Sequence, residues 1–224
     1  MKPDCHRIGV IPFGNIPDIV PNVIAAHISG YLNLEAVLLE TKAEPNYALD
    51  RQRIVDNFYP AGSVVASHFT PCAIPGGCEG PAWPDQDLDM ARQLLAEAGY
   101  PNGLTLTMDT RNNFPTLDMA QAIQSTFALG GVKLEIIPMD GKQALTKYRA
   151  RNHEIYIGRW GPDYQDPHTN ADTFAKNVDN ADDAKAKPLA WRNAWDIPEM
   201  SKKTDAAVKE SDPEKRAQMY LELK

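Results

Sequence analysis

The feature that most constrains the fold is an alternation of strand-like and helix-like apolar patterns in the middle of the chain. Strands are expected at residues 104–109, 132–138 and 154–159, where apolar residues run together or alternate with polar ones. Between them, residues 116–129 and 142–151 carry apolar side chains at helical spacing. Strands that alternate with helices at this spacing predict parallel pairing through right-handed crossovers. We therefore expect an α/β fold with a mixed, mainly parallel sheet and flanking helices.

Four further helices are expected outside this unit. Pro60 and Gly99 each follow an apolar helical pattern, and both are residue types at which helices end. Ser211 stands three residues before Glu214, which is the spacing of a capping box, so a helix start is expected there. The expected helices lie at residues 47–58, 85–98, 198–210 and 212–223.

The first 42 residues show a separate pattern. One strand is expected at residues 6–13 and another at residues 34–39, and apolar residues at helical spacing lie between them at residues 20–31. This order predicts a small β-α-β unit at the start of the chain.

Composition places the chain among ordinary globular proteins and excludes several classes of function. Hydrophobic residues make up 43% and charged residues 24% of the 224 residues, a balance that allows a sizeable core. The net charge of −7 is repelled by phosphate backbones, so no nucleic-acid partner is expected. No apolar run approaches the roughly 18 residues that cross a bilayer, and no cationic segment followed by an apolar stretch opens the chain. We therefore expect no direct membrane insertion and no signal peptide, which leaves a cytoplasmic chain or a mature or truncated form of an exported one.

Polar and aromatic residues gather where two of the expected parallel strands end. One strand is followed by an arginine and an asparagine, and the strand at residues 154–159 runs into an aromatic and acidic segment. Ligands of open α/β sheets bind beyond the carboxyl ends of the strands, so both ends are expected to face one crevice. Aromatic rings supply stacking area and carboxylates supply a place for a cation; the alternative is a strand end with a polar turn and no ligand. The expected ligand-binding residues are Trp160, Asp163, Tyr164, Asp166, Arg111 and Asn112.

Cys72 and Cys78 lie in a segment at residues 61–84 that is rich in Pro, Gly and Ser and is expected to be a long ordered loop. The residues between the two cysteines include Pro-Gly-Gly and can bend back, so a local disulfide is expected in an oxidising compartment. Two free thiols, or a metal site that includes His68, are the alternatives. A tetrahedral zinc site needs a fourth ligand and usually closer cysteine spacing, so no metal is expected. Cys5 is left over, which fits an exported protein poorly.

Catalytic signatures are incomplete in this sequence. Ser63, Ser67 and His68 cluster in the loop, but no Gly-x-Ser-x-Gly elbow surrounds them. No glycine-rich phosphate loop is present, and no cofactor is expected. A zinc peptidase needs His-Glu-x-x-His on a helix, whereas His153-Glu154 opens a strand-like apolar run. We therefore expect a protein that is not an enzyme.

Four passages of the chain carry a family resemblance. They read YALDRQRIV, DMARQLLAEAGYPNG, GRWGPDYQDP and SDPEKRAQMYLEL, at residues 47–55, 89–103, 158–167 and 211–223. The third is similar to a Gly-Trp-x-x-Asp-Tyr-x-Asp-Pro strand end, and the fourth to a late Asp-Pro-x-x-Arg-x-x-Leu-Tyr helix. In this order the passages resemble the peptide-type extracytoplasmic solute-binding proteins of ABC importers, known as solute-binding family 5.

The resemblance implies one lobe of a type II periplasmic-binding-protein-like architecture. In such proteins two lobes close around an extended oligopeptide or a similar solute. Carried onto this sequence, Asp163 would pair with the ammonium group of the peptide, and Trp160 and Tyr164 would wall the ligand. The resemblance also implies a periplasmic or extracytoplasmic location and ABC permease subunits as partners of the full-length parent.

The resemblance covers residues 43–224, which are expected to form a solute-binding lobe that is cut within a larger protein. One lobe supplies half a cleft, so weak binding is expected. Residues 1–42 fall outside the resemblance and weakly resemble the opening of archaemetzincin-type zinc peptidases. The alternatives to a solute-binding lobe are therefore an inactive derivative of such a peptidase or an engineered chimeric α/β scaffold.

Overall fold

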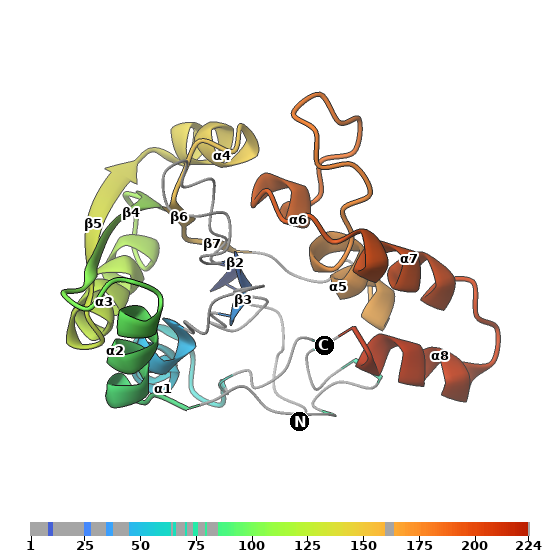
Figure 1. The fold of residues 1–224 in the computed structure, drawn as a ribbon, viewed down its shortest axis with the longest axis horizontal. Helices are drawn as coiled ribbons and strands as arrows, with labels where there is room; N and C mark the ends of the chain where they lie inside the picture. The colour runs from blue at the N-terminus through green and yellow to red at the C-terminus, as the bar shows by residue number, and fades with distance from the viewer. Residues whose placement is uncertain are drawn as a thin grey trace.

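The chain forms an α/β group and a helical group, which lie on opposite sides of Figure 1. The computed structural model describes residues 9–10, 25–27, 35–37, 45–63, 65, 70, 74–75, 79, 85–159 and 164–223. The α/β group holds η1 (Pro45–Ala48), α1 (Arg51–Phe58), α2 (Leu88–Glu97), β4 (Leu104–Arg111), α3 (Thr116–Leu129), β5 (Val132–Met139), α4 (Gly141–Arg149) and β6 (Ile155–Tyr156). The helical group holds α5 (Pro167–Phe174), α6 (Leu189–Arg192), α7 (Pro198–Ala207) and α8 (Pro213–Leu221). Short strands complete the described elements: β1 (Gly9–Val10), β2 (Ala25–His27), β3 (Glu35–Val37) and β7 (Gly158–Arg159).

The main sheet has the strand order β5-β4-β6, with β4 at its centre. β4 pairs with β5 in parallel along its whole length, from Leu104 opposite Val132 to Arg111 opposite Met139. β6 pairs with the other edge of β4, also in parallel. The parallel pairing of the three strands that the sequence predicts is therefore confirmed.

The two faces of this sheet are covered by different helices. Successive side chains of a strand point to opposite faces. Leu106 and Met108 of β4 pack with Phe127 of α3 in the main hydrophobic core. On the other face, Tyr148 of α4 packs with Tyr156 of β6 in a smaller cluster. The central strand β4 is therefore largely buried on both faces, as is usual for parallel sheets, whereas Lys133 and Glu135 of the edge strand β5 are exposed.

Aspartates set the start of most of the helices. A carboxylate at the N-cap accepts backbone N–H groups that have no partner within the helix, and its charge interacts favourably with the helix dipole. The capping aspartates are Asp50 (α1), Asp87 (α2), Asp140 (α4), Asp166 (α5) and Asp212 (α8).

Two of the predicted helix starts and one predicted cap are wrong for this reason. The helix predicted at residues 85–98 begins at Leu88, because Asp87 caps it. The pattern at residues 47–58 predicts one helix, but Asp50 caps α1 so that it begins at Arg51, and the preceding residues form the 3-10 turn η1. The predicted capping box that begins at Ser211 is also wrong. The side chain of Asp212 accepts the N–H of Lys215 instead, because the residue nearest the first turn supplies the stronger, charged acceptor.

The β-α-β unit predicted for the start of the chain is wrong. β2 lies where the apolar spacing predicts a helix, and it pairs with β3 in the antiparallel direction, with His27 opposite Glu35. β1 pairs in the antiparallel direction with β7, with Gly9 opposite Arg159. Spacing alone does not decide between helix and strand when a partner strand is present to accept the backbone hydrogen bonds.

The strand predicted at residues 154–159 is divided into β6 and β7. The N–H of Ile157 still donates to the carbonyl of Asp109 at 3.0 Å. β7 then leaves β4 and pairs with β1. The helices α5 and α6 are absent from the sequence prediction, since both are too short to show a helical period. Most of the predicted loop at residues 61–84 lies outside the described residues, but Thr70 and Ile74 within it are buried.

Arg151 links the helical group to the α/β group. It follows α4, is buried, and donates hydrogen bonds to the carbonyl groups of Trp191 and Asn180. Its guanidinium lies 3.9 Å from the centre of the Trp191 ring, within the range of a cation–π contact. One buried side chain therefore joins α4 to α6 and to the segment before it.

Gly103 and Gly99 offer a matched pair of substitutions in left-handed backbone, with φ of +87° and +96°. A methyl group at Gly103 would lie 2.5 Å from the carbonyl oxygen of Gly131, whereas no atom of the described residues lies within 4 Å of the same position at Gly99. Gly99→Ala is expected to lower the free energy of unfolding by about 1–2 kcal/mol, the cost of left-handed backbone. Gly103→Ala is expected to lower it clearly more, since the backbone must also shift. Urea unfolding measures both losses, and equal losses would contradict the steric explanation.

Candidate functional site

The strand order places a topological switch point at the carboxyl end of β4. From β4 the chain passes through α3 to one neighbouring strand and then through α4 to the other. Ligands of open α/β sheets bind in the crevice that such a reversal leaves beyond the strand ends. Asp109 lies opposite Tyr156 in the pair formed by β4 and β6, so the residues that follow both of them reach the same edge. This carboxyl edge of β4 and β6 is the candidate site.

Arg111 and Asn112 lie at this edge, as the sequence predicts. Arg111 ends β4 and Asn112 follows it, and both are exposed. The N–H of Asn112 donates to the carbonyl of Met139 at 2.9 Å, which extends the ladder between β4 and β5 by one residue. The Arg111 side chain lies along the start of α4, where a methyl group at Gly141 would be 3.7 Å from its Cδ and Nε. The edge therefore presents a cation and an amide to the surroundings.

Tyr156 packs beneath this edge, with its ring stacked on Tyr148 at a centroid distance of 4.3 Å and an angle of 7° between the planes. Burial raises the pKa of Tyr156, and the positive charge of Arg111 opposes that rise. Gly158 passes so close that a methyl group there would lie 2.6 Å from a carbon of the Tyr156 ring. Glycine at this position is therefore explained by the lack of room between the backbone and the ring.

Asp109 forms a buried ion pair with Lys147 of α4, with 2.7 Å between Oδ1 and Nζ. The Asp109 side chain is 1% exposed, and its Oδ2 makes no hydrogen bond to any residue that the structure describes. Burial raises the pKa of Asp109, while the hydrogen bond from Lys147 lowers it. Because an unpaired charge in this position would be costly, the pair ties α4 to the central strand directly behind Arg111.

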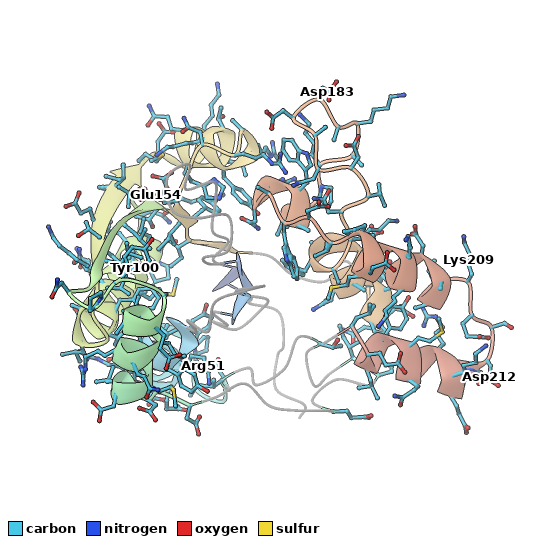
Figure 2. All side chains as sticks on the ribbon, in the orientation of Figure 1. Arg51, Tyr100, Glu154, Asp183, Lys209 and Asp212 are labelled. Atoms are coloured by element: carbon cyan, nitrogen blue, oxygen red, sulfur yellow. The ribbon has the colours of Figure 1, made fainter. Side chains whose placement is uncertain are left out.

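His153 and Glu154, which precede β6, both have partners within the fold. Glu154 lies beside β4 (Figure 2), where its carboxylate accepts the hydroxyl and the N–H of Thr107. His153 is buried, and its ring lies edge-on to Tyr148 at 5.1 Å between centroids. Within the described part of the chain, no group of three or more His, Cys, Asp and Glu side chains could hold a metal ion.

Asp166 is held within the chain from two directions. Its Oδ1 accepts the N–H of His168 at 2.8 Å, which caps α5. Arg216 of α8 donates Nη1 to Oδ2 and Nη2 to Oδ1, each at 2.8 Å. The hydrogen bond from Arg216 is the main reason why the pKa of Asp166 lies below its ordinary value. The predicted ligand residue Asp166 therefore has a structural role that the sequence interpretation does not include.

Tyr164 lies two residues before Asp166 and is 52% exposed. Its carbonyl accepts the N–H of Asp166 at 2.9 Å, so its backbone is tied to the residue that caps α5. The other predicted site residues lie outside the described residues, and their roles stay predictions: Trp160, Asp163, Cys72 and Cys78.

Sequence reasoning missed three residues that shape this region, namely Lys147, Tyr156 and Arg216. The arginine of the passage at residues 211–223 is a signal for Arg216, but its partner Asp166 is 50 positions away. No local spacing reveals such a pair. For Lys147 no local signal exists, because its helix α4 follows β5, whereas its partner Asp109 lies on β4, 38 positions earlier.

The described residues at this edge are suited to holding a ligand by charge and hydrogen bonding. A guanidinium presents paired N–H donors that match a carboxylate, and an asparagine amide both donates and accepts.

None of the helices in the described ranges is long and apolar enough to cross a membrane.

Comparison with known sequences matches the region that contains the site. The family described as "Bacterial extracellular solute-binding proteins, family 5 Middle" matches residues 46–182. The glutathione-binding protein GsiB of Salmonella typhimurium (strain LT2) is 27% identical over 194 residues, which cover 79% of this chain and 35% of that protein. The chain thus spans about a third of the length of the curated relatives that it matches.

Solved structures share the fold. HbpA2 from Haemophilus parasuis has a TM-score of 0.76 at 20% identity, and the match covers 97% of this chain and 39% of that chain. The periplasmic binding protein DppA from Helicobacter pylori, in complex with the peptide STSA, has a TM-score of 0.73 at 21% identity, with coverage of 97% and 38%. The expected α/β architecture of a periplasmic binding protein is therefore confirmed.

His153 makes the stability of the fold depend on pH. Burial lowers its pKa to about 4, a side-chain hydrogen bond with Asn193 opposes the shift, and the charge of Lys147 adds to it. Between pH 6.5, the ordinary pKa of histidine, and pH 4, the unfolded chain binds a proton that the folded chain does not. The free energy of unfolding is therefore expected to fall as the pH falls through this window, by at most about 3 kcal/mol.

His153→Phe, which keeps the ring and removes the titrating group, is expected to flatten this pH dependence in urea unfolding between pH 7 and pH 4. His168 is the matched control, because burial also lowers its pKa. His168→Gln should leave the contribution of His153 in place. If the wild type and His153→Phe have the same pH dependence, His153 is not its cause.

Proposed function

The chain belongs to the bacterial extracellular solute-binding proteins, family 5, and from this premise we propose that it is the ligand-binding lobe of a protein that captures an oligopeptide or a similar solute for an ABC importer. The parent protein works outside the cytoplasm and delivers the solute to permease subunits. The proposal contains no catalytic step. A second lobe, supplied by the rest of the parent, closes over the solute and excludes water from it.

The observation that carries this proposal is the exposed pair Arg111 and Asn112 at the switch point of the sheet. A peptide ends in a carboxylate, and the guanidinium of Arg111 can bind it through two parallel hydrogen bonds. The Asn112 amide can donate to and accept from a peptide backbone. Contacts of this kind read groups that every peptide has, so they suit a binding protein that accepts different side chains.

Asp163 supplies the opposite charge in this proposal. By resemblance to the family it pairs with the ammonium group of the peptide, and Trp160 and Tyr164 flank the ligand. The exposure of Tyr164 supports this arrangement, because an aromatic ring that is half exposed has area to offer to a solute. A solute with separated positive and negative ends is then held at both ends.

The domain limits are also part of the proposal. The sequence predicts that residues 43–224 form the lobe and that residues 1–42 are separate from it. The pairing of β1 with β7 argues against a boundary at residue 42. β1 belongs to the first 42 residues, and β7 begins the proposed ligand passage at residues 158–167. We therefore assign both parts of the chain to one lobe.

Calorimetric titration with short peptides tests the function, with glutathione included because the GsiB relatives are named for it. Asp163→Asn is expected to weaken binding of free peptides by about tenfold or more, as a lost charge pair of about 1.4 kcal/mol predicts. Binding of N-acetylated peptides, which have no ammonium group, should be unchanged by the substitution. Equal losses for free and acetylated peptides would show that Asp163 does not bind the amino terminus.

Arg111→Met tests the other end of the ligand. It is expected to weaken binding of peptides with a free carboxylate by about tenfold, and to have little effect on peptides with an amidated carboxyl end. Arg53→Met is the matched control, because Arg53 is an exposed arginine of α1. The control removes one positive charge from the chain, and it should leave both titrations unchanged. Should Arg53→Met weaken binding as much as Arg111→Met, the effect belongs to net charge and Arg111 is not a specific contact.

A further inference from the structure

We propose that Arg216 is a positioning residue for ligand binding, which holds Tyr164 in place through the carboxylate of Asp166. The inference rests on the proposed function, because Tyr164 belongs to the passage that is proposed to contact the solute. Arg216 itself lies on α8 and is not proposed to touch the ligand.

The contact between Arg216 and Asp166 fixes direction as well as distance. Both η nitrogens donate to the two carboxylate oxygens at 2.8 Å, which is the paired geometry that gives an arginine–carboxylate contact its specificity. The two side chains are 23% and 32% exposed, so water screens the pair only in part. Arg216 thereby holds Asp166 against α8, in addition to the hydrogen bond that Asp166 accepts from the N–H of His168.

Arg216 is itself held in one orientation by Tyr220, which lies one turn later in α8. Nη2 of Arg216 donates to the Tyr220 hydroxyl at 3.3 Å, and the guanidinium lies 4.8 Å from the centre of the Tyr220 ring. Tyr220 is buried in a cluster with Ala171 of α5 and Ala207 of α7. Arg216 therefore projects from three helices that pack together, so the position of its guanidinium beside Asp166 is fixed.

Tyr164 is connected to the pair formed by Arg216 and Asp166 through its backbone. Its carbonyl accepts the N–H of Asp166, so movement of Asp166 moves the carbonyl of Tyr164. Arg216, through Asp166, is therefore linked to the backbone on which the Tyr164 ring is mounted.

A purely structural role predicts a different result from a positioning role. Asp166 caps α5 through the N–H of His168, and that hydrogen bond does not need Arg216. If Arg216 only strengthens the contact between α5 and α8, its loss lowers the melting temperature and leaves ligand affinity unchanged in the folded chain. If Arg216 positions Tyr164, its loss weakens binding, and it does so only when the Tyr164 ring is present.

The test measures peptide affinity by calorimetry for Arg216→Met, Tyr164→Ala and the double variant, at a temperature where circular dichroism shows each to be folded. Each single variant is expected to bind about tenfold more weakly than the wild type, and the double variant is expected to bind as weakly as Tyr164→Ala alone, because residues that act through one another are not additive. A double variant whose loss is the product of the two single losses would overturn the inference.

Lys215→Met is the matched control. Lys215 is the neighbour of Arg216 on α8, and its ammonium pairs with Glu210, with no contact to Asp166 among the described interactions. The control removes the same charge from the same helix and is expected to keep wild-type affinity. Equal losses for Lys215→Met and Arg216→Met would overturn the inference in favour of a general charge effect.

Arg216→Lys keeps the charge and loses the paired geometry, so it provides a second measurement if Arg216→Met does not fold. Its affinity is expected to lie between those of the wild type and Tyr164→Ala, and wild-type affinity in Arg216→Lys would contradict the need for paired hydrogen bonds. The outcomes for the two proposals are distinct. A wild-type chain that binds no peptide contradicts the proposed function and this inference with it, whereas a wild type and an Arg216→Met variant that bind equally well contradict this inference alone.

Discussion

The parallel pairing of β4 with a strand on each side is the constraint on which the rest of the structure depends. A central strand has its backbone groups satisfied on both edges, so its side chains must be covered on both faces. The two crossovers supply that cover, with α3 on the face of Leu106 and Met108 and α4 on the face of Asp109. Because α3 leads from β4 to the strand on one side and α4 leads from that strand to the one on the other side, the carboxyl end of β4 is a topological switch point.

The α4 face of β4 shows how this constraint produces a site. Thr107, Asp109 and Arg111 lie two residues apart and therefore share this face. The first is paired with Glu154 and the second with Lys147, both within the fold. Arg111 is exposed at the end of the strand and also interacts with the side chain of Tyr156 beneath it. The same alternation that builds the interior thus delivers a cation to the edge where a solute is proposed to bind.

The aromatic and acidic passage at residues 158–167 is anchored by elements from opposite ends of the chain. At its start, Gly158 lies opposite Val10 of β1. At its end, Asp166 is held by Arg216 of α8, a helix whose first residues lie far from the α/β group, as the position of Asp212 in Figure 2 shows. The two acidic residues of the passage then have different roles. Asp166 stabilises the fold, and Asp163 is proposed to bind the ligand. Rigid support of this kind is what a binding site needs in order to keep its geometry.

The sequence by itself determined the α/β class, the three parallel strands and the convergence of their carboxyl ends, because these follow from local apolar spacing and from general rules of chain handedness. It also placed Arg111 and Asn112 at the edge. The antiparallel pairing of β2 with β3 and the bonds from Arg216 to Asp166 and from Lys147 to Asp109 were decided only by the tertiary structure. Each of these joins residues that no local pattern relates, and each depends on burial and on the choice of partner, which exist only once the chain has folded.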